Sequence, residues 1–304
     1  MLVHVIAVLG ECVADAFATR RNGQLTLRVH PGGGPANTAV ALARLGTPTR
    51  FLGRIADDVF GRLFRDHLAD SGVDLTAAVP AAEPSTLAIA ALDAEGQAAY
   101  SFHADGAADW QWTADELDPH SVGGVSCLHT GSLALVREPG ADAVAGFVAA
   151  LAPHATISID PNVRPGLAGR AAYLARLPMG ADILKLSEED LGYLLPGTAL
   201  EEGCDTWHAA GVRLVVVTRG AAGALVSLDG ERVRVPGVPV KVVDTVGAGD
   251  AFTAGLLHHL GAAGLLGGRL DGLDLEAARA AAVHGARVAA LTCTVPGADP
   301  PWFS

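Results

Sequence analysis

The chain has 304 residues and a formal net charge of −12, so nucleic acid and anionic membrane surfaces are excluded as main partners because both attract dense Lys and Arg. Half of the residues are hydrophobic and 18% are charged, which is a globular and not a disordered composition. At this length we expect one large domain with a small appendage.

Short β-branched runs alternate with helical stretches along the chain. This alternation predicts an α/β fold with a doubly wound, mostly parallel sheet and helices on both faces. The predicted strands include Val3–Leu9, Thr156–Asp160, Asp182–Leu186 and Leu214–Thr218, and the predicted helices include Ala36–Leu45, Gly61–Ser71, Gly140–Leu151 and Ala251–Leu260.

Two segments, Cys12–Val29 and Thr86–His103, read instead as hairpins. Asn22-Gly23 and Glu95-Gly96 are turn signals between alternating runs in them. We therefore expect a single domain over residues 1–304, with a small β-sheet lid inserted from about 12–29 and 86–103. A homodimer through this lid is a further expectation.

The cysteines, Cys12, Cys127, Cys204 and Cys293, form no CxxC pair and no cluster with zinc-ligand spacing, which favours free thiols in a reducing compartment. The first ten residues carry no export signal. No charge-free apolar run is about 18 residues long, as a membrane span requires. We expect a cytoplasmic protein that contacts neither membrane nor nucleic acid.

The strongest motif is Asp244-Thr-Val-Gly-Ala-Gly-Asp250 followed by small residues. A strand-like run, Val240–Val243, leads into a glycine turn and then a helix, whose first N–H groups and dipole favour an anion. An Asp at this position suits acceptance of a hydroxyl proton beside a phosphoryl group. Alternatively, Asp250 only caps the helix. No GxGxxG fingerprint or Walker loop is present.

The second motif is Gly32-Gly33-Gly34-Pro35-Ala36-Asn37. Its glycines allow a ligand to approach the backbone, Pro35 suits a first helical turn, and Asn37 can donate to and accept from a polyol. A flexible loop with Asn37 as a cap is the alternative.

Together the two motifs resemble the signatures of the ribokinase-like (phosphofructokinase-B type) sugar kinase family. Further segments are similar to that family, so the likeness covers nearly the whole chain: Phe51–Gly61, Ala181–Asp190 and Val217–Gly223. The resemblance implies a ribokinase-like fold, ATP with Mg²⁺, and in-line transfer of the γ-phosphoryl group to a sugar hydroxyl.

Carried over by position, the resemblance also implies roles for individual residues. The catalytic group would be Asp250 as the base, with Gly247, Ala248 and Gly249 as the anion hole; the nucleotide would contact Lys185, Thr218, Gly220, Gly223 and Ala286. Ser187 and Asp190 would organise the waters of Mg²⁺, although relatives often have Asn and Glu there, and an acidic helix start is the alternative. Potassium would lie beside Asp244, Val246, Thr292, Val295 and Gly297.

Within the family, details resemble the fructokinase branch, notably Gly10–Asp15, His129–Leu133 and Ile159–Arg164. The sugar would be bound by Asp15, Gly32, Gly33, Asn37, Asn162 and Arg164. Asp15 could instead be a turn residue, and Arg164 part of a structural ion pair. Ala104 replaces an Arg that many fructokinases and keto-acid sugar kinases carry, which weakens the case for a sugar acid.

From this resemblance we expect the substrate to be fructose or a closely related neutral ketohexose. Three alternatives remain open: a 2-keto-3-deoxy-sugar-acid kinase, a nucleoside kinase that would need a larger apolar pocket, and a non-catalytic sugar or nucleotide sensor. A sensor would be expected to lose its base, whereas Asp250 is intact.

Overall fold

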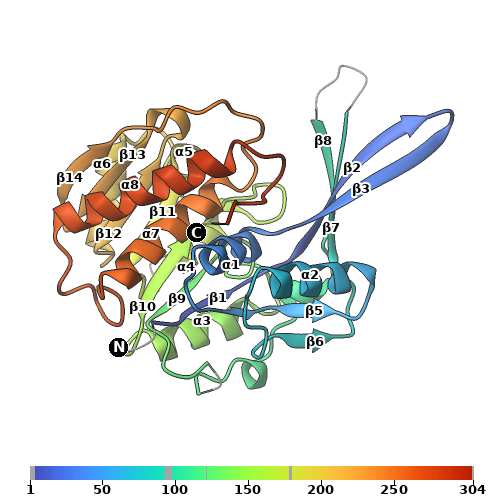
Figure 1. The fold of residues 1–304 in the computed structure, drawn as a ribbon. Coiled ribbons are helices and arrows are strands. Elements are labelled where there is room, and N and C mark those ends of the chain that lie inside the picture. The colour runs from blue at the N-terminus through green and yellow to red at the C-terminus, as the bar shows by residue number, and fades with distance from the viewer. Residues whose placement is uncertain (1–3, 93–97, 121, 178–179, 303–304) are drawn as a thin grey trace.

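The fold is known from a computed structural model that describes residues 4–92, 98–120, 122–177 and 180–302. Its main body is a sheet of eight strands in the order β14-β13-β12-β11-β10-β9-β1-β4 (Figure 1). The six strands from β12 to β4 are parallel, and β13 and β14 are antiparallel. Their bounds are β1 Ile6–Leu9, β4 Thr49–Leu52, β9 Cys127–Gly131, β10 Thr156–Asp160, β11 Ile183–Ser187, β12 Leu214–Thr218, β13 Ala224–Leu228 and β14 Glu231–Val235.

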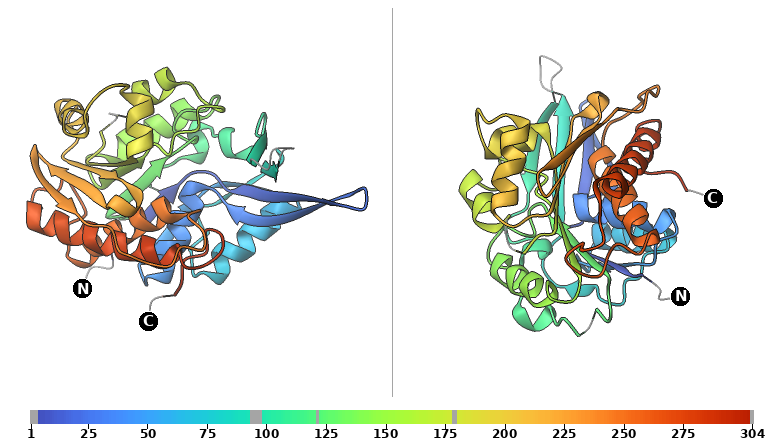
Figure 2. Two further views of the ribbon diagram at one scale, coloured as in Figure 1. Left: turned by 90° about the horizontal axis from the view of Figure 1, so that it is seen from above. Right: turned by 90° about the vertical axis from the view of Figure 1, so that its left-hand side faces the viewer.

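Helices cover both faces of this sheet (Figures 1 and 2). One face packs against α1, α2, α7 and α8, and the other packs against α3, α4, α5 and α6, with a separate hydrophobic cluster on each side. The predicted doubly wound α/β class is thus confirmed. The helices are α1 Gly34–Arg44, α2 Val59–Asp70, α3 Ala141–Leu151, α4 Arg170–Arg176, α5 Glu188–Leu194, α6 Leu200–Ala209, α7 Ala248–Ala262 and α8 Leu275–Thr292.

A second sheet of four strands projects from the body in the order β3-β2-β7-β8 (Figure 1). We call it the lid. The Asn22-Gly23 turn joins β2 to β3 as predicted, whereas Glu95-Gly96 falls outside the described residues. The strands of the lid are β2 Val13–Arg21, β3 Gln24–Gly32, β7 Thr86–Leu92 and β8 Ala98–His103. A third sheet consists of two short parallel strands, β5 Arg54–Ala56 and β6 Val79–Ala81.

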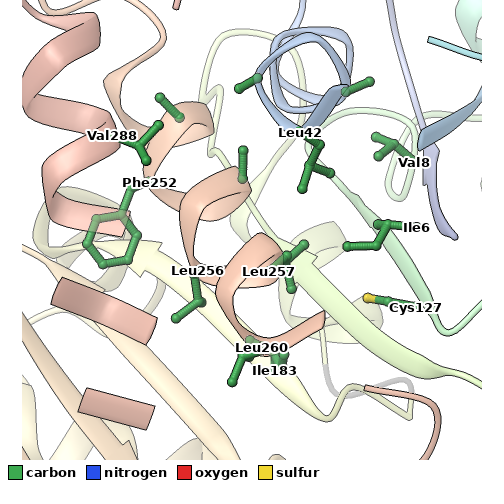
Figure 3. Close-up of a cluster of buried hydrophobic side chains, with 14 of the residues drawn as sticks. Ile6, Val8, Leu42, Cys127, Ile183, Phe252, Leu256, Leu257, Leu260 and Val288 are labelled. Atoms are coloured by element: carbon green, nitrogen blue, oxygen red, sulfur yellow. The ribbon is translucent and has the colours of Figure 1, made fainter. Parts of the chain in front are cut away.

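Helix α7 is held rigidly between the sheet and α8. Phe252, Leu256 and Leu260 are buried on it, and Figure 3 shows these side chains among Val288 of α8 and Ile183 of β11. Burial of such side chains contributes about 1.5–3 kcal/mol each. The start of α7 is therefore a fixed platform for the residues around Asp250.

One strand prediction was wrong: Val240–Val243 is irregular and not a strand. Its β-branched residues have strand propensity, but Val242 and Val243 are 58% and 56% exposed, and the run joins none of the three sheets. Strand propensity reflects packing on a half-buried pleated surface, which this run does not have. The N–H of Val243 donates to the carbonyl of Cys293 at 2.8 Å, and within the part of the chain that the structure describes the run makes no other backbone hydrogen bond through an N–H.

Among the described residues, no helix is long and apolar enough to cross a membrane.

Candidate active site

A cavity of about 570 Å³ opens where the parallel strands end and the lid overhangs them. Residues at or just after the carboxyl ends of five neighbouring strands line it: Glu11, Ser132, Asp160, Ser187 and Thr218. In doubly wound sheets ligands bind at this edge, because the strand ends diverge there and leave a crevice. The lid adds Val13, Asp15, Thr86 and Phe102.

Asp250 lies in the first turn of α7 and faces this cavity. Its Oδ2 accepts a hydrogen bond from Asn37 Nδ2 at 2.8 Å, and the N-cap of α7 is Gly247, so Asp250 is not the helix cap. Burial raises the pKa of Asp250 to about 6, against the lowering effect of the Asn37 bond. Its carboxylate is therefore the main form at neutral pH and a better proton acceptor than an ordinary Asp.

The glycine turn before Asp250 presents backbone donors to the cavity. Gly247 has φ 76°, a left-handed conformation in which a side chain would be strained. The N–H of Ala248 donates to the Thr245 carbonyl at 3.2 Å, but those of Gly247 and Gly249 have no backbone acceptor among the described residues. Of the three predicted anion-hole residues, these two keep a donor for an anion, and the N–H of Asp250 is a third.

A buried ion pair flanks these donors. Lys185 Nζ lies 2.7 Å from Asp160 Oδ2, and a Cβ added to Gly249 would lie 3.0 Å from the same Nζ. Burial alone would lower the pKa of Lys185, but the Asp160 carboxylate raises it above its ordinary value. A fixed ammonium thus stands beside the anion hole, where added negative charge would be stabilised.

The predicted sugar ligands gather on the lid side of the cavity. Asp15 lies within β2, not in a turn, and burial raises its pKa to about 6 while Arg164 opposes the rise. A Cβ on Gly32 would lie 2.1 Å from Asp15 Oδ2, so glycine is needed for the carboxylate to fit. Asn162 and Arg164 also line the cavity, and Arg164 forms no ion pair with any described residue. Gly33 lines the cavity, whereas Gly32 does not.

A second, mostly apolar cavity of about 470 Å³ adjoins the first. Thr218, Thr245 and Gly249 line both cavities, so the predicted anion hole lies at their junction. The predicted nucleotide residues Gly220, Gly223 and Ala286 line this second cavity. The two cavities together have room for a nucleotide whose flat base lies in the second cavity and whose phosphates extend past Gly249 towards Asp250.

The predicted Mg²⁺ residues Ser187 and Asp190 form a capping box at the start of α5. Ser187 Oγ donates to Asp190 Oδ2 at 2.7 Å, and Asp190 Oδ1 accepts from Val163 N at 2.9 Å. The alternative interpretation of these residues, an acidic helix start, is therefore correct. It does not exclude a metal role, because Asp190 Oδ1 has only one donor and so retains a free lone pair, and both residues line the cavity.

The predicted potassium residues lie in the loop of Asp244 and Val246 and in the segment that comprises the last residue of α8, Thr292, and the loop after it; Asp244 joins the two. Its Oδ1 accepts from Val246 N at 3.1 Å and its Oδ2 from Gly297 N at 2.8 Å. Burial raises the pKa of Asp244, but these backbone donors outweigh it and hold the pKa below its ordinary value. The loops 244–246 and 293–297 are thereby held together beside the glycine turn, and carboxylate and carbonyl oxygens suit a hard cation.

At the carboxyl ends of the parallel strands, three polar cavity residues had been given no role of their own from the sequence: Glu11, Ser132 and Asp160. All follow or end buried strands of the parallel sheet. The signal that could have found them is the rule that ligands bind at the carboxyl ends of parallel strands. Their side chains belong to no phosphate-binding motif, which is why motif reading passed over them. Ala104, in contrast, is buried outside the cavity, where its carbonyl accepts from Trp110 Nε1 at 2.8 Å.

A buried carboxylate beside free helix-terminal N–H groups, placed where two cavities adjoin on a doubly wound sheet, is typical of a phosphoryl-transfer enzyme. Comparison with known proteins is specific: the chain belongs to the pfkB family of carbohydrate kinases, whose sequence model matches residues 3–303. The family resemblance of the motifs is confirmed.

Several fructokinases are similar over most of their length. The chain is 36% identical over 281 residues to one from Rhizobium leguminosarum bv. trifolii, covering 90% of this chain and 86% of the relative. A fructokinase of Klebsiella pneumoniae is 37% identical over 267 residues, covering 86% and 85%.

Solved structures show the same similarity. The fructokinase of Xylella fastidiosa with bound ATP superposes with a TM-score of 0.89 at 30% identity, covering 99% of this chain and 96% of that one. A double mutant of the Vibrio cholerae O395 fructokinase with fructose, ADP and potassium bound has a TM-score of 0.83 at 29% identity, covering 98% and 94%. The ribokinase-like fold is thus confirmed.

Proposed function

We propose that this protein is an ATP-dependent fructokinase that transfers the γ-phosphoryl group of ATP to a hydroxyl of fructose. The observation that carries the proposal is the position of Asp250, hydrogen-bonded to Asn37 and adjacent to free helix-terminal N–H groups where the two cavities join. The fructokinase relatives and the fructose- and ATP-containing neighbours support the choice of substrates.

In the proposed reaction the acceptor hydroxyl of the sugar donates to Asp250 Oδ1. Asn37 holds the other carboxylate oxygen and so fixes the direction of the base. As the sugar oxygen bonds to the γ-phosphorus and the bond to the β-phosphate oxygen breaks, the hydroxyl proton passes to Asp250. The N–H groups of Gly247 and Gly249, with Lys185, stabilise the charge on the transferring group.

Magnesium, when bound, neutralises charge on the phosphates. Asp190, with Ser187, would hold it through water, because both face the cavity with lone pairs to spare. The adenine would lie in the apolar cavity near Gly223 and Ala286.

The charge of the sugar cavity favours a neutral substrate. Only two cations line it, Arg164 and Lys185, among the described residues, and Lys185 is already paired. A sugar carboxylate would meet more repulsion than attraction, which disfavours a keto-acid substrate. The facing carboxylates are Glu11, Asp15, Asp160, Glu189, Asp190 and Asp250.

A coupled assay of ADP release tests the proposal directly. The panel contains ketoses, aldoses, sugar acids and nucleosides, each at several concentrations with ATP and Mg²⁺. Fructose is expected to have the highest kcat/KM. A higher value for 2-keto-3-deoxygluconate, ribose or a nucleoside would refute the substrate assignment, and no turnover of any compound would support the sensor alternative.

Asp15→Ala is expected to raise KM for fructose at least about tenfold and leave KM for ATP unchanged. Asp15 presents a carboxylate that can accept two hydroxyl hydrogen bonds, and loss of such a partner leaves the bound hydroxyls unpaired. Initial rates with each substrate varied in turn measure the effect. Asp105→Ala, a change at an exposed carboxylate outside the cavity, is the control. An unchanged KM for fructose would remove Asp15 from the site.

A monovalent cation is expected to raise kcat. We propose that K⁺ lies between the loops that Asp244 joins, near Val246, Thr292, Val295 and Gly297, where it would support the adjoining anion turn. Activity is compared in KCl and tetramethylammonium chloride at equal ionic strength. Equal rates would contradict the site, and Asp244→Asn should reduce any difference between the salts.

We also propose that two copies pair through the lid. Apolar side chains are exposed on both of its faces, with Phe17 and Phe102 on the side of Asp15 and Leu25 and Leu27 on the other. Sedimentation velocity is expected to show a dimer that Phe17→Glu or Leu25→Glu weakens, and a monomeric wild type would contradict it.

We propose a cytoplasmic location for the protein. The unpaired cysteines support this location, since disulfides are rare in the cytoplasm.

A further inference from the structure

Glu11 is a cavity residue to which the proposed reaction gives no role. It follows β1 at the point where the chain leaves the main sheet for the lid. Its side chain lines the sugar cavity, yet the residue is only 2% exposed. A carboxyl group this deeply buried is normally held by donors on both oxygens, since an unpaired one is costly.

One oxygen of Glu11 lacks such a donor. Oε2 is buried without a hydrogen-bond partner among the described residues, while the Ser132 side chain lies within reach of the carboxyl group. Burial raises the pKa of Glu11 to about 7. The carboxyl group thus keeps an unused acceptor at a residue that lines the proposed sugar cavity.

The neighbouring Asp109 shows what a structural carboxylate looks like in the same place. It is also 2% exposed, and burial raises its pKa to about 6. Both of its oxygens are satisfied, however, because Oδ1 accepts from Cys12 N at 2.9 Å and Oδ2 from Thr86 Oγ1 at 2.6 Å. Asp109 therefore ties the bases of two lid strands together and does not line the cavity, whereas Glu11 lines it.

The charges around Glu11 favour an uncharged hydrogen-bond donor on the ligand, such as a hydroxyl group. Asp109 repels a charge on Glu11 and Arg164 attracts it, and Arg164 also acts on Asp15 and Asp250. One guanidinium is thus shared by three cavity carboxyl groups. Glu11 follows β1 whereas Asp250 lies in the first turn of α7, so the two carboxyl groups line the cavity from different elements.

We propose that Glu11 is a specificity-determining residue of the sugar cavity, with Oε2 accepting a hydrogen bond from a sugar hydroxyl other than the one that is phosphorylated. The inference rests on the proposed sugar kinase function. It assigns one hydroxyl of the substrate to Glu11, in addition to those that Asp15 contacts. Analogues without that hydroxyl would leave the buried oxygen unpaired and bind poorly.

The test compares wild type with Glu11→Met and Glu11→Gln. Met has a similar volume but no strong acceptor, whereas Gln retains one, so Glu11→Met is expected to lower kcat/KM for fructose at least about tenfold and Glu11→Gln much less. KM for ATP should be unchanged in both. Asp109→Asn, which alters a buried carboxylate outside the cavity, is the control.

The decisive measurement uses the set of monodeoxyfructoses, as substrates or, where the acceptor hydroxyl is missing, as inhibitors. Wild type and Asp109→Asn should both discriminate strongly against the one analogue that lacks the hydroxyl contacted by Glu11. Glu11→Met should use that analogue almost as well as fructose, because once the carboxyl group is gone, loss of the hydroxyl has little further effect. Unchanged discrimination in Glu11→Met overturns the proposal. If that variant does not fold, Glu11→Ala, which also removes the acceptor, decides with the same set: weakened discrimination at a single hydroxyl supports the contact, and an unchanged pattern overturns it.

Failure of the proposed function is distinguishable from failure of this inference. Wild-type turnover of fructose is measured first. If another neutral sugar is the better substrate, the fructose assignment is wrong, and the same comparison with the monodeoxy forms of that sugar then supports or overturns the role of Glu11.

Discussion

Asp250→Asn is expected to lower kcat by about 10²–10⁴-fold, the usual contribution of a positioned general base. The two side chains have the same shape, and an Asn carbonyl oxygen can still accept from Asn37, which holds Oδ2 at 2.8 Å. The variant therefore loses proton acceptance and little else. Steady-state kinetics give kcat, and equilibrium titration gives the ATP affinity, which should remain within about threefold of wild type.

A second Asp at a helix start provides the matched control. Asp274 caps α8 and accepts from Ala277 N at 2.8 Å, and Asn caps helices about as well as Asp does. Asp274→Asn should therefore retain wild-type activity. If Asp250→Asn retained kcat within about threefold as well, Asp250 would have only a structural role.

The sequence predicted the fold class and most of the strand positions, because β-branched runs between helices leave few other arrangements. Thr156–Asp160 and Leu214–Thr218 were predicted to the residue. These strands are buried on both faces, so local pattern and tertiary environment agree. Val240–Val243 has the same local pattern but no partner strand, and partner strands cannot be read from a single segment.

The site was predicted where residues are adjacent in the chain and missed where they meet only in the fold. Gly247 to Asp250 form a motif because one turn builds the whole anion site. Asp160 and Lys185 lie 25 positions apart and become neighbours through the parallel register of β10 and β11. Glu11 lines the cavity only because the fold brings the end of β1, the lid and Ser132 together. Local motifs do not identify such residues; only their position after a predicted parallel strand points to the site.

Lys185→Met is expected to cost both stability and activity. The change leaves the Asp160 carboxylate, whose residue is 6% exposed, without its cation, and removal of one member of a buried ion pair typically costs about 3–5 kcal/mol. The melting temperature should fall by roughly 5–15 °C. Loss of the ammonium beside Gly249 should lower kcat by about 10²–10³-fold, as for other donors to a developing charge.

The double variant Asp160→Asn with Lys185→Met separates the two effects. It buries no unpaired charge, so differential scanning calorimetry should show most of the lost stability regained, because a neutral pair avoids the desolvation cost. Its kcat should remain low, since no cation faces the anion hole. Recovery of activity together with stability would show that Lys185 acts only through the fold. A wild-type melting temperature for Lys185→Met would instead show that Asp160 finds another partner or a proton.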